Sequence, residues 1–505
     1  MGLNPYANET ITYSHNSRMN HSFHNRSFSP TDEQQNIFDV INTGKNFVVQ
    51  AFAGTGKTTT IIESIRRLPS EKLILYVAFN KSIVDEVSGK IAPNTDSRTA
   101  HSLAYRFVSS IDPRLNEKLG KRNKITHVRS IHSLLLSNGY KVSRYEASLY
   151  ALLINKFIKS DLYELEPQSI CNEILSRLLS FYFDKFWYEN YLPKLKSSSS
   201  PFEIAKADFP FLNDSALLLL INDRRKEDTI LLPLIRKIID NPEADELSNL
   251  KVFIQSQLTK IRLIASVIWE EVTNCRSEFG FTHDLYLKLW QLSKPKMNYD
   301  VIFVDECQDI DPVMMSVLKN QTSQLIWVGD RYQQIYEWRG AINAMERINN
   351  AETLSLTYTF RFPSELTIYS NKCLQLLGSK SSITSLKALD SELSHKINKV
   401  TYIYRTNSSA LLTIAEECKA GNKVSADLGL DLKAAGKLCY EICRIIMIEN
   451  YSSTVPDLEM ATSVSDIKFI IDMTENNTLK HCFDICKKHD FSINKIQELF
   501  QQIDR

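Results

Sequence analysis

Residues 48–60 read V-V-Q-A-F-A-G-T-G-K-T-T-T, and this stretch decides the fold. An apolar run leads into it and an apolar-periodic segment follows it, so the pattern predicts a strand, a glycine-containing turn and a helix. Gly54 and Gly56 can adopt backbone angles closed to other residues, which lets consecutive N–H groups surround phosphate oxygens. The start of the helix adds unpaired N–H donors and a positive dipole end. The stretch therefore predicts a nucleotide site, with ATP as the expected ligand.

Lys57 and Thr58 stand at the start of this predicted helix. We expect the lysine to reach the β- and γ-phosphates and the Thr58 hydroxyl to bind Mg²⁺. The other loop residues expected to contact the nucleotide are Ala53, Gly54, Thr55, Gly56 and Thr59. The strict pattern has glycine where this chain has Ala51, so the match is to A-x-x-G-x-G-K-T. A chance glycine-rich loop is the alternative, which Gly-Lys-Thr between a strand and a helix disfavours.

The bulk composition limits what else the chain can be. Its 505 residues are enough for two or more domains that each bury a core. Lys plus Arg total 60 and Asp plus Glu total 59, so contacts with nucleic acid must come from local patches. No apolar run could span a bilayer and no signal-peptide core is present. We expect an intracellular protein with no membrane contact, cytoplasmic if bacterial and nuclear if eukaryotic.

The nine cysteines show no paired framework of the kind that secreted proteins have. Cys439 and Cys443 form one pair with i, i+4 spacing, and Cys482 and Cys486 form another, flanked by histidines. Both pairs lie on apolar-periodic stretches. We therefore expect buried cysteines on helices rather than a zinc site.

Three more apolar runs of strand length end in polar residues. Residues 73–77 lead to Phe79 and Asn80, residues 301–304 to Asp305 and Glu306, and residues 325–328 to Asp330. Continuous apolar runs are typical of strands covered on both faces. Since ligands bind along the carboxyl edge of open parallel sheets, we expect an α/β fold with the site at that edge. A further strand is predicted over residues 400–404.

Charged and amide side chains at this edge suggest hydrolysis of a phosphoanhydride. Asp305 is expected to hold Mg²⁺, and Glu306 to orient and deprotonate the attacking water. Gln333, just past Asp330, is a candidate sensor of the γ-phosphate because an amide both donates and accepts. Arg361 is expected to neutralise γ-phosphate charge in the transition state.

Two residues are candidates for the adenine base. Gln34 lies one element ahead of the loop and could read the adenine edge through its amide, or be a surface residue. Phe360, beside Arg361, could stack on the ring.

The segment 333–340 reads Q-Q-I-Y-E-W-R-G and places aromatic residues directly after the nucleotide-sensing turn. Tyr336 and Trp338 can stack on unpaired bases, and Arg339 can pair with a phosphate. Packing in the core is the alternative. The position of the segment favours coupling between ATP and a single strand of nucleic acid.

These motifs together resemble the superfamily 1 DNA helicases of the UvrD/Rep group. The matching pieces are A-F-A-G-T-G-K-T, T-A-H-S-L-A-Y, V-D-E-C-Q-D, V-G-D-R-Y-Q-Q-I-Y-E-W-R-G-A, L-T-Y-T-F-R and Y-R-T-N. F-N-K-S-I and H-D-L-Y-L-K-L-W-Q-L-S-K-P resemble the F-box DNA helicase branch, although no F-box precedes the motifs. The resemblance runs from about Phe28 to the end of the chain.

The resemblance implies an ATP- and Mg²⁺-dependent 3′→5′ helicase or translocase on single-stranded DNA, acting in DNA repair or recombination. The residues that it would place along the DNA are Phe79, Asn80, Lys81, His101, Tyr336, Trp338 and Arg339. In the group's pattern an aromatic residue stands two positions before the Asn-Lys pair, whereas here Phe79 adjoins Asn80. Recombinase filaments are a further candidate partner.

The implied architecture is a RecA-like parallel-sheet lobe with a large helical insertion and an incomplete second RecA-like lobe. We expect a flexible tail over 1–27, the first lobe over 28–105 and 286–350, the insertion over 106–285 and the partial second lobe, with a helical end, over 351–505.

The sequence departs from the family's pattern near its end. A Ser/Ala-Lys-Gly-Leu-Glu segment and a Val-Thr-Arg-Ala segment with a second γ-phosphate arginine are missing before Arg505. The chain is therefore expected to be C-terminally truncated, or completed by another chain that supplies these motifs. An ATP-binding switch with weak hydrolysis, which binds single-stranded DNA or a protein without motor activity, is the alternative function. A P-loop small-molecule kinase is more remote, since it would not need the aromatic cluster.

Replacing Trp338 with alanine tests the stacking role. Trp338→Ala is expected to weaken binding of single-stranded DNA, because stacking contributes about 1–3 kcal/mol per base, while leaving ATP affinity unchanged. Titration of a fluorescent oligonucleotide and of an ATP analogue measures the two separately. Unchanged DNA affinity would rule out stacking on this side chain.

Overall fold

The computed structural model describes residues 28–121, 128–186, 191–208, 217, 248–335, 342–348, 351–386, 402–404, 407–422, 424, 432–449, 451–455, 458, 461–474 and 477–503. The chain divides into two compact units, one formed by residues 1–116 and 282–400 and the other by residues 117–281 and 401–505. The predicted tail over 1–27 lies outside the described residues.

The first unit is built on a six-stranded sheet with the order β3-β2-β4-β5-β1-β6. Every neighbouring pair of strands is parallel. The strands are β1 (Phe47–Ala51), β2 (Ile74–Ala78), β3 (Thr95–Thr99), β4 (Val301–Asp305), β5 (Gln324–Gly329) and β6 (Glu352–Leu356). The predicted α/β fold with a parallel sheet is confirmed.

The four strands that the sequence predicts occupy the middle of this sheet and are buried along their length. The two edge strands were not predicted, because β3 reads T-D-S-R-T and is only half-buried, while β6 has two exposed residues at its start. Pairing of β6 with β1 places residues 352–356 in the first sheet, although the sequence analysis assigned them to the second lobe. Beyond β6 the division into lobes stays a prediction.

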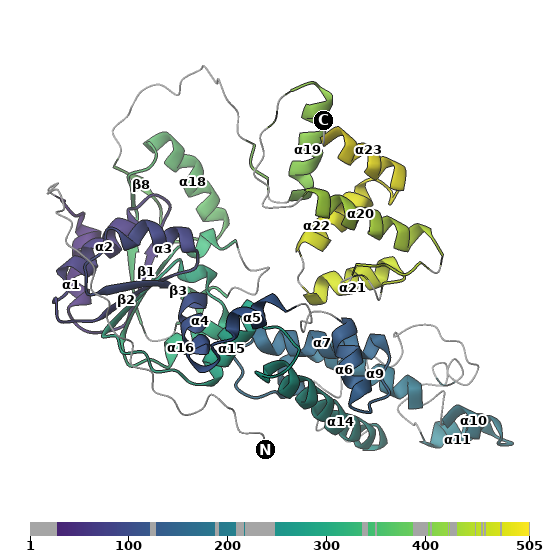
Figure 1. Ribbon diagram of the computed structural model, residues 1–505. Helices are drawn as coiled ribbons and strands as arrows, with labels where there is room; N and C mark the ends of the chain where they lie inside the picture. The colour runs from purple at the N-terminus through teal and green to yellow at the C-terminus, as the bar shows by residue number, and fades with distance from the viewer. Residues whose placement is uncertain are drawn as a thin grey trace. The chain divides into compact units, whose positions relative to one another are not determined.

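Helices cover both faces of the sheet because each strand presents alternate side chains to opposite faces. Apolar residues of α1 (Asp32–Ile41), α2 (Lys57–Arg67) and α3 (Lys81–Ser88) share one core with the strands. The helices on the other side are α4 (Ala100–Ile111), α15 (His283–Leu292) and α16 (Pro312–Lys319), as Figure 1 shows. This arrangement leaves the carboxyl ends of the strands to the connecting loops, where the site forms.

Shorter elements complete the first unit. The segment after β5 contains the 3₁₀ turn η4 (Arg331–Gln333) and helix α17 (Ala344–Arg347), and the turn η3 (Cys307–Asp309) follows β4. After β6 the chain forms β7 (Tyr358–Thr359), α18 (Ser364–Leu376) and β8 (Thr384–Ser385), and β7 pairs with β8 in parallel. Residues 402–404 do not form the strand predicted over 400–404, and residues 400 and 401 lie outside the described residues.

The second unit is helical in all its described regular elements. The helices before residue 282 are α5 (Leu115–Gly120), which begins in the first unit, α6 (Val128–Ser137), α7 (Arg144–Lys159), α8 (Pro167–Ile170), α9 (Asn172–Phe186), α10 (Leu192–Lys196), α11 (Pro201–Asp208) and α14 (Ser248–Thr273). Those after residue 401 are α19 (Asn407–Lys419), α20 (Leu432–Met447), α21 (Val464–Thr474), α22 (Asn477–Lys488) and α23 (Ile493–Ile503). Within the described ranges, no helix is both long and apolar enough to cross a bilayer.

The cysteine pairs lie on two helices of this unit that pack against each other. Cys439 and Cys443 on α20, and Cys482 and Cys486 on α22, are all fully buried in one apolar core. The Cys486 thiol donates to the Cys439 carbonyl at 3.3 Å. The prediction of buried helical cysteines is therefore confirmed.

Candidate nucleotide-binding site

The predicted phosphate-binding loop connects β1 to α2 at the carboxyl edge of the sheet. Gly54 has a left-handed backbone, with φ of 73°. A Cβ atom at this position would lie 2.4 Å from Arg361 Cβ and 2.7 Å from Thr359 Oγ1. The loop therefore needs glycine here for two reasons, its backbone angle and the close approach of residues 359–361. The Thr55 hydroxyl closes the turn by donating to the Phe52 carbonyl at 2.8 Å.

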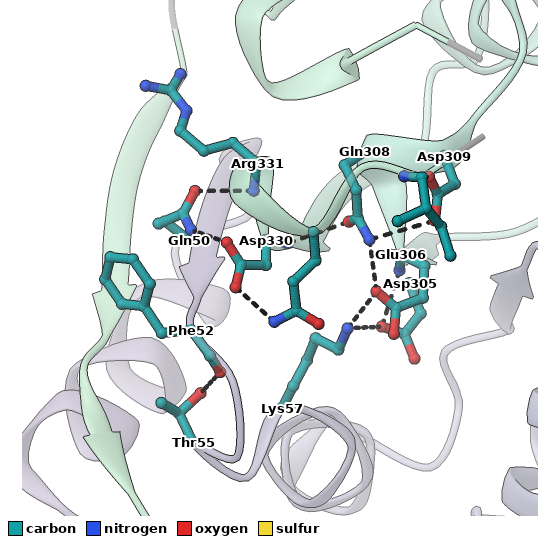
Figure 2. Close-up of polar contacts among 12 residues, drawn as sticks. Gln50, Phe52, Thr55, Lys57, Asp305, Glu306, Gln308, Asp309, Asp330 and Arg331 are labelled. Atoms are coloured by element: carbon teal, nitrogen blue, oxygen red, sulfur yellow. Dashed lines mark hydrogen bonds and ion pairs between the residues drawn. The ribbon is translucent and has the colours of Figure 1, made fainter. Parts of the chain in front are cut away.

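Lys57, Asp305 and Glu306 meet at this edge, as Figure 2 shows. Lys57 Nζ lies 3.8 Å from Asp305 Oδ1 and forms a closer ion pair with Glu306 Oε2. The Tyr76 hydroxyl donates to the other oxygen of Asp305 at 2.6 Å. Strands β1, β2 and β4 thus bring together the lysine and both carboxylates that the sequence singled out.

The charges of this cluster support one another in spite of burial. Burial by itself lowers the pKa of Lys57, but Asp305 and Glu306 outweigh it, so the pKa is raised above its ordinary value. Asp305 is fully buried, and this burial raises its pKa, while Lys57 acts in the opposite direction. A buried carboxylate is costly without a cationic partner, so Asp305 suits a site that receives a cation.

Glu306 has an unusual backbone conformation for a residue other than glycine. Its φ of 52° lies in the left-handed region that non-glycine residues seldom adopt. Strain of this sort costs on the order of 1–3 kcal/mol and gathers at functional sites. Gln308 Nε2 donates to Glu306 Oε2 at 2.8 Å and holds the carboxylate in place. The geometry favours a functional role for Glu306 over that of an exposed acidic turn.

A network of buried amides extends from Glu306 to the end of β5. Gln308 Oε1 accepts from the Asp330 backbone at 3.1 Å. The Asp330 carboxylate in turn accepts from Gln50 at 2.9 Å and from Gln333 at 2.6 Å. Gln333, the expected phosphate sensor, is exposed and is oriented by the Asp330 carboxylate directly after β5. Gln50 and Gln308 were not predicted from the sequence. A signal was present for Gln50, because it is a polar residue inside the apolar run of β1.

The two candidates for the adenine both lie close to Gly56. A Cβ atom at Gly56 would lie 3.4 Å from Gln34 Nε2 and 3.6 Å from the Phe360 ring. Gln34 is buried; its Nε2 donates to Thr60 Oγ1 at 2.9 Å and its Oε1 accepts from Thr31 N at 3.0 Å. Phe360 is 49% exposed, so its ring face is open to a ligand.

Arg361 follows Phe360 directly on the segment that touches the loop. Its Cβ abuts Gly54, and its side chain is exposed. The remaining loop candidates are placed along the turn and the first turn of α2, where Thr58 is half-buried and Thr59 exposed. The predicted loop residues, Gln34, Phe360 and Arg361 therefore lie in or against one loop.

Two of the predicted DNA residues share a small cavity with the carboxylates. Its lining includes Phe79, His101, Asp305, Glu306 and Asp311. Asn80 is half-buried at the start of α3, and Lys81 is exposed in its first turn. The other three candidates, Tyr336, Trp338 and Arg339, lie outside the described residues.

The segment that begins at His283, which resembles the F-box DNA helicase branch, is a buried helix that supports the site. It forms α15, and seven consecutive residues of this helix, from Leu285 to Gln291, are buried. The His283 ring packs edge-on against His101 and accepts from or donates to the Tyr286 hydroxyl at 2.9 Å. The helix therefore supports α4, which carries His101.

The raised pKa of Lys57 gives a pH dependence of stability. Below the ordinary value of 10.5 the lysine is protonated in both states, and the ion pair contributes fully. Above it the unfolded chain loses the proton first, so the free energy of unfolding falls as pH rises through the higher folded-state pKa. Denaturant unfolding of wild type and Lys57→Met from about pH 9 to about pH 12 should show a difference that shrinks with pH. A constant difference would contradict the pairing.

Comparisons with known proteins agree with the geometry. Residues 31–354 match the model of the UvrD/REP helicase N-terminal domain. The chain is 30% identical over 344 residues, 66% of its length, to F-box DNA helicase 1 of Gallus gallus, and 26% identical over 362 residues, 69% of its length, to F-box DNA helicase protein 1 of Schizosaccharomyces pombe. A probable DNA helicase II homologue of Mycoplasma genitalium is 26% identical over 331 residues, 62% of the chain. The matches cover only 27%, 33% and 37% of these relatives. The chain belongs to the UvrD/Rep helicase family.

Proposed function

We propose that this chain binds ATP with Mg²⁺ and uses its hydrolysis to move along single-stranded DNA as a helicase motor. The observation that carries the proposal is the meeting of Lys57, Asp305 and Glu306 beside a glycine loop that Arg361 abuts. A lysine, two carboxylates and an arginine around one loop are the groups that phosphoryl transfer to water needs.

The donor set fits a hard cation. Asp305 is a buried carboxylate, and Thr58 stands in the first turn of α2, whose start is a favourable place for phosphate. We assign Mg²⁺ to Thr58 and Asp305, where it would neutralise charge on the β- and γ-phosphates. Ala53, Gly54, Thr55, Gly56 and Thr59 would surround the phosphates, with Gln34 and Phe360 at the base.

The ion pair between Lys57 and Glu306 suggests how binding prepares hydrolysis. A γ-phosphate competes with Glu306 for the lysine, since both are anions. Once released, the Glu306 carboxylate can accept a proton from the attacking water, and Gln333 can orient that water through its amide. Arg361 would stabilise the charge that develops on the transferred phosphoryl group.

The shared cavity supports a link between hydrolysis and DNA. Phe79 and His101 line it together with Asp305 and Glu306, so a strand bound at these residues lies next to the hydrolytic carboxylates. Asn80 and Lys81 would contact the same strand, and Tyr336, Trp338 and Arg339 would extend the path. Unwinding with 3′→5′ polarity, in DNA repair or recombination, is the activity that we propose for this path.

The relatives' names add finer proposals. Those names describe DNA helicases, which supports single-stranded DNA as the partner. We also propose recombinase filaments as a further partner and an intracellular location, cytoplasmic in a bacterium or nuclear in a eukaryote. The insertion over 106–285 and a partial second lobe after β6 complete the proposed architecture.

Phosphate release on single-stranded DNA tests the motor. Wild type should release phosphate from ATP faster when single-stranded DNA is added, and Lys57→Ala should abolish turnover because the phosphates lose their cation. Phosphate release is measured with and without an oligonucleotide, and ATP binding is measured in parallel. Wild-type turnover in Lys57→Ala would refute the phosphate assignment. ATP binding by wild type without any release would favour the switch over the motor.

A further inference from the structure

The segment between β6 and α18 is tied to α1 by a carboxylate that the nucleotide site does not itself use. Glu33 Oε2 accepts from the Thr357 backbone N–H at 2.7 Å, and Glu33 Oε1 accepts from the Thr357 hydroxyl at 2.6 Å. Both oxygens of one carboxylate thus hold a single residue 324 positions away in the sequence. Hydrogen bonds to a charged acceptor are about twice as strong as neutral ones.

Thr357 stands where the chain leaves the sheet, just before the residues that touch the phosphate loop. Two positions later, the fully buried Thr359 donates from its hydroxyl to the Ala53 carbonyl at 3.0 Å. The Phe360 backbone N–H donates to the Gly54 carbonyl at 2.9 Å. The segment 357–361 is therefore held at both ends, by α1 and by the loop.

Helix α1 carries one of the two groups at the base slot, Gln34, and the segment 357–361 carries the other, Phe360. Gln34 is the next residue after Glu33, and both its amide and the Phe360 ring lie close to Gly56. The distance between the Gln34 amide and the Phe360 ring therefore depends on how α1 and the segment 357–361 are held together. Glu33 is the side chain that joins them.

We propose that Glu33 is a positioning residue for nucleotide selection, acting through Thr357 to hold Phe360 against the base. Both of its carboxylate oxygens are bonded to Thr357. Losing it would leave the phosphate loop and Lys57 in place but free the ring to move away from the slot. The inference rests on the proposed ATP site and adds to it the element that makes the site recognise a base.

Two ligands distinguish the contribution of the base to binding from that of the phosphates. ATP fills the whole site, whereas inorganic tripolyphosphate reaches only the loop and Lys57. Glu33→Gln keeps the size of the side chain and its capacity for two hydrogen bonds to Thr357, but it removes the charge that strengthens them. Its Kd for ATP is expected to rise about tenfold, the equivalent of about 1.4 kcal/mol, while its Kd for tripolyphosphate stays within about threefold of wild type.

Further variants keep the test independent of folding. Thr357→Val removes only the hydroxyl and should weaken ATP binding without weakening tripolyphosphate binding. Thr357→Ser keeps the hydroxyl and should restore ATP binding. The double variant Glu33→Gln/Thr357→Val should lose less ATP affinity than the sum of the two single losses, because the hydroxyl that Thr357→Val removes is itself bonded to Glu33. Asp39→Asn is the matched control, since Asp39 lies on the same helix and bonds only to Gln35 in the described contacts.

The outcomes are distinct. If wild type fails to bind ATP, the proposed function fails and this inference with it. If wild type binds ATP and Glu33→Gln binds it equally well, or loses ATP and tripolyphosphate to the same extent, the positioning role is overturned while the nucleotide site stands. A lower melting temperature without a change in either Kd would likewise reduce Glu33 to a structural contact.

Discussion

The ion pair between Lys57 and the carboxylates of β4 is the interaction on which the rest of the site depends. Asp305 is fully buried, and a buried carboxylate without a partner would be expensive. Lys57 offsets this cost only because β1 and β4 run parallel and end at the same edge of the sheet. The same topology places the left-handed Glu306 next to the lysine. Fold and chemistry are thus linked through one cluster of charge, and phosphate binding would exchange partners within it.

Contacts across the edge connect this cluster to its surroundings. The buried amides of Gln50 and Gln308 meet at Asp330 and so join β1, β4 and β5 into one polar network. On the opposite side of the loop, residues 357–361 hydrogen-bond to Ala53 and Gly54. A change in the loop on nucleotide binding would therefore be felt at Arg361 by direct backbone contact. On the other side of Asp305, the cavity with Phe79 and His101 offers a similarly short path towards DNA.

Local sequence patterns predicted the four central strands and the polar residues at their ends. The edge strands and the contacts between residues far apart in the sequence were not predicted. Strands β1, β2, β4 and β5 were predicted because central parallel strands are apolar throughout, and their polar ends identified Lys57, Asp305 and Glu306. Strands β3 and β6 were not predicted because edge strands face water on one side and lack a continuous apolar run. The contact of Glu33 with Thr357 joins residues 324 positions apart, and although Thr357 lies within L-T-Y-T-F-R, no pattern in the sequence pairs it with Glu33. Such pairs are visible only once the sheet has brought them together.

A crystal structure with Mg²⁺ and a non-hydrolysable ATP analogue tests the central claim most directly. The account predicts the β- and γ-phosphates on Lys57, the metal between Thr58 and Asp305, and Glu306 released from the lysine to face a water molecule. An analogue bound elsewhere, or an intact pair of Lys57 and Glu306 with the phosphates in the loop, would contradict it.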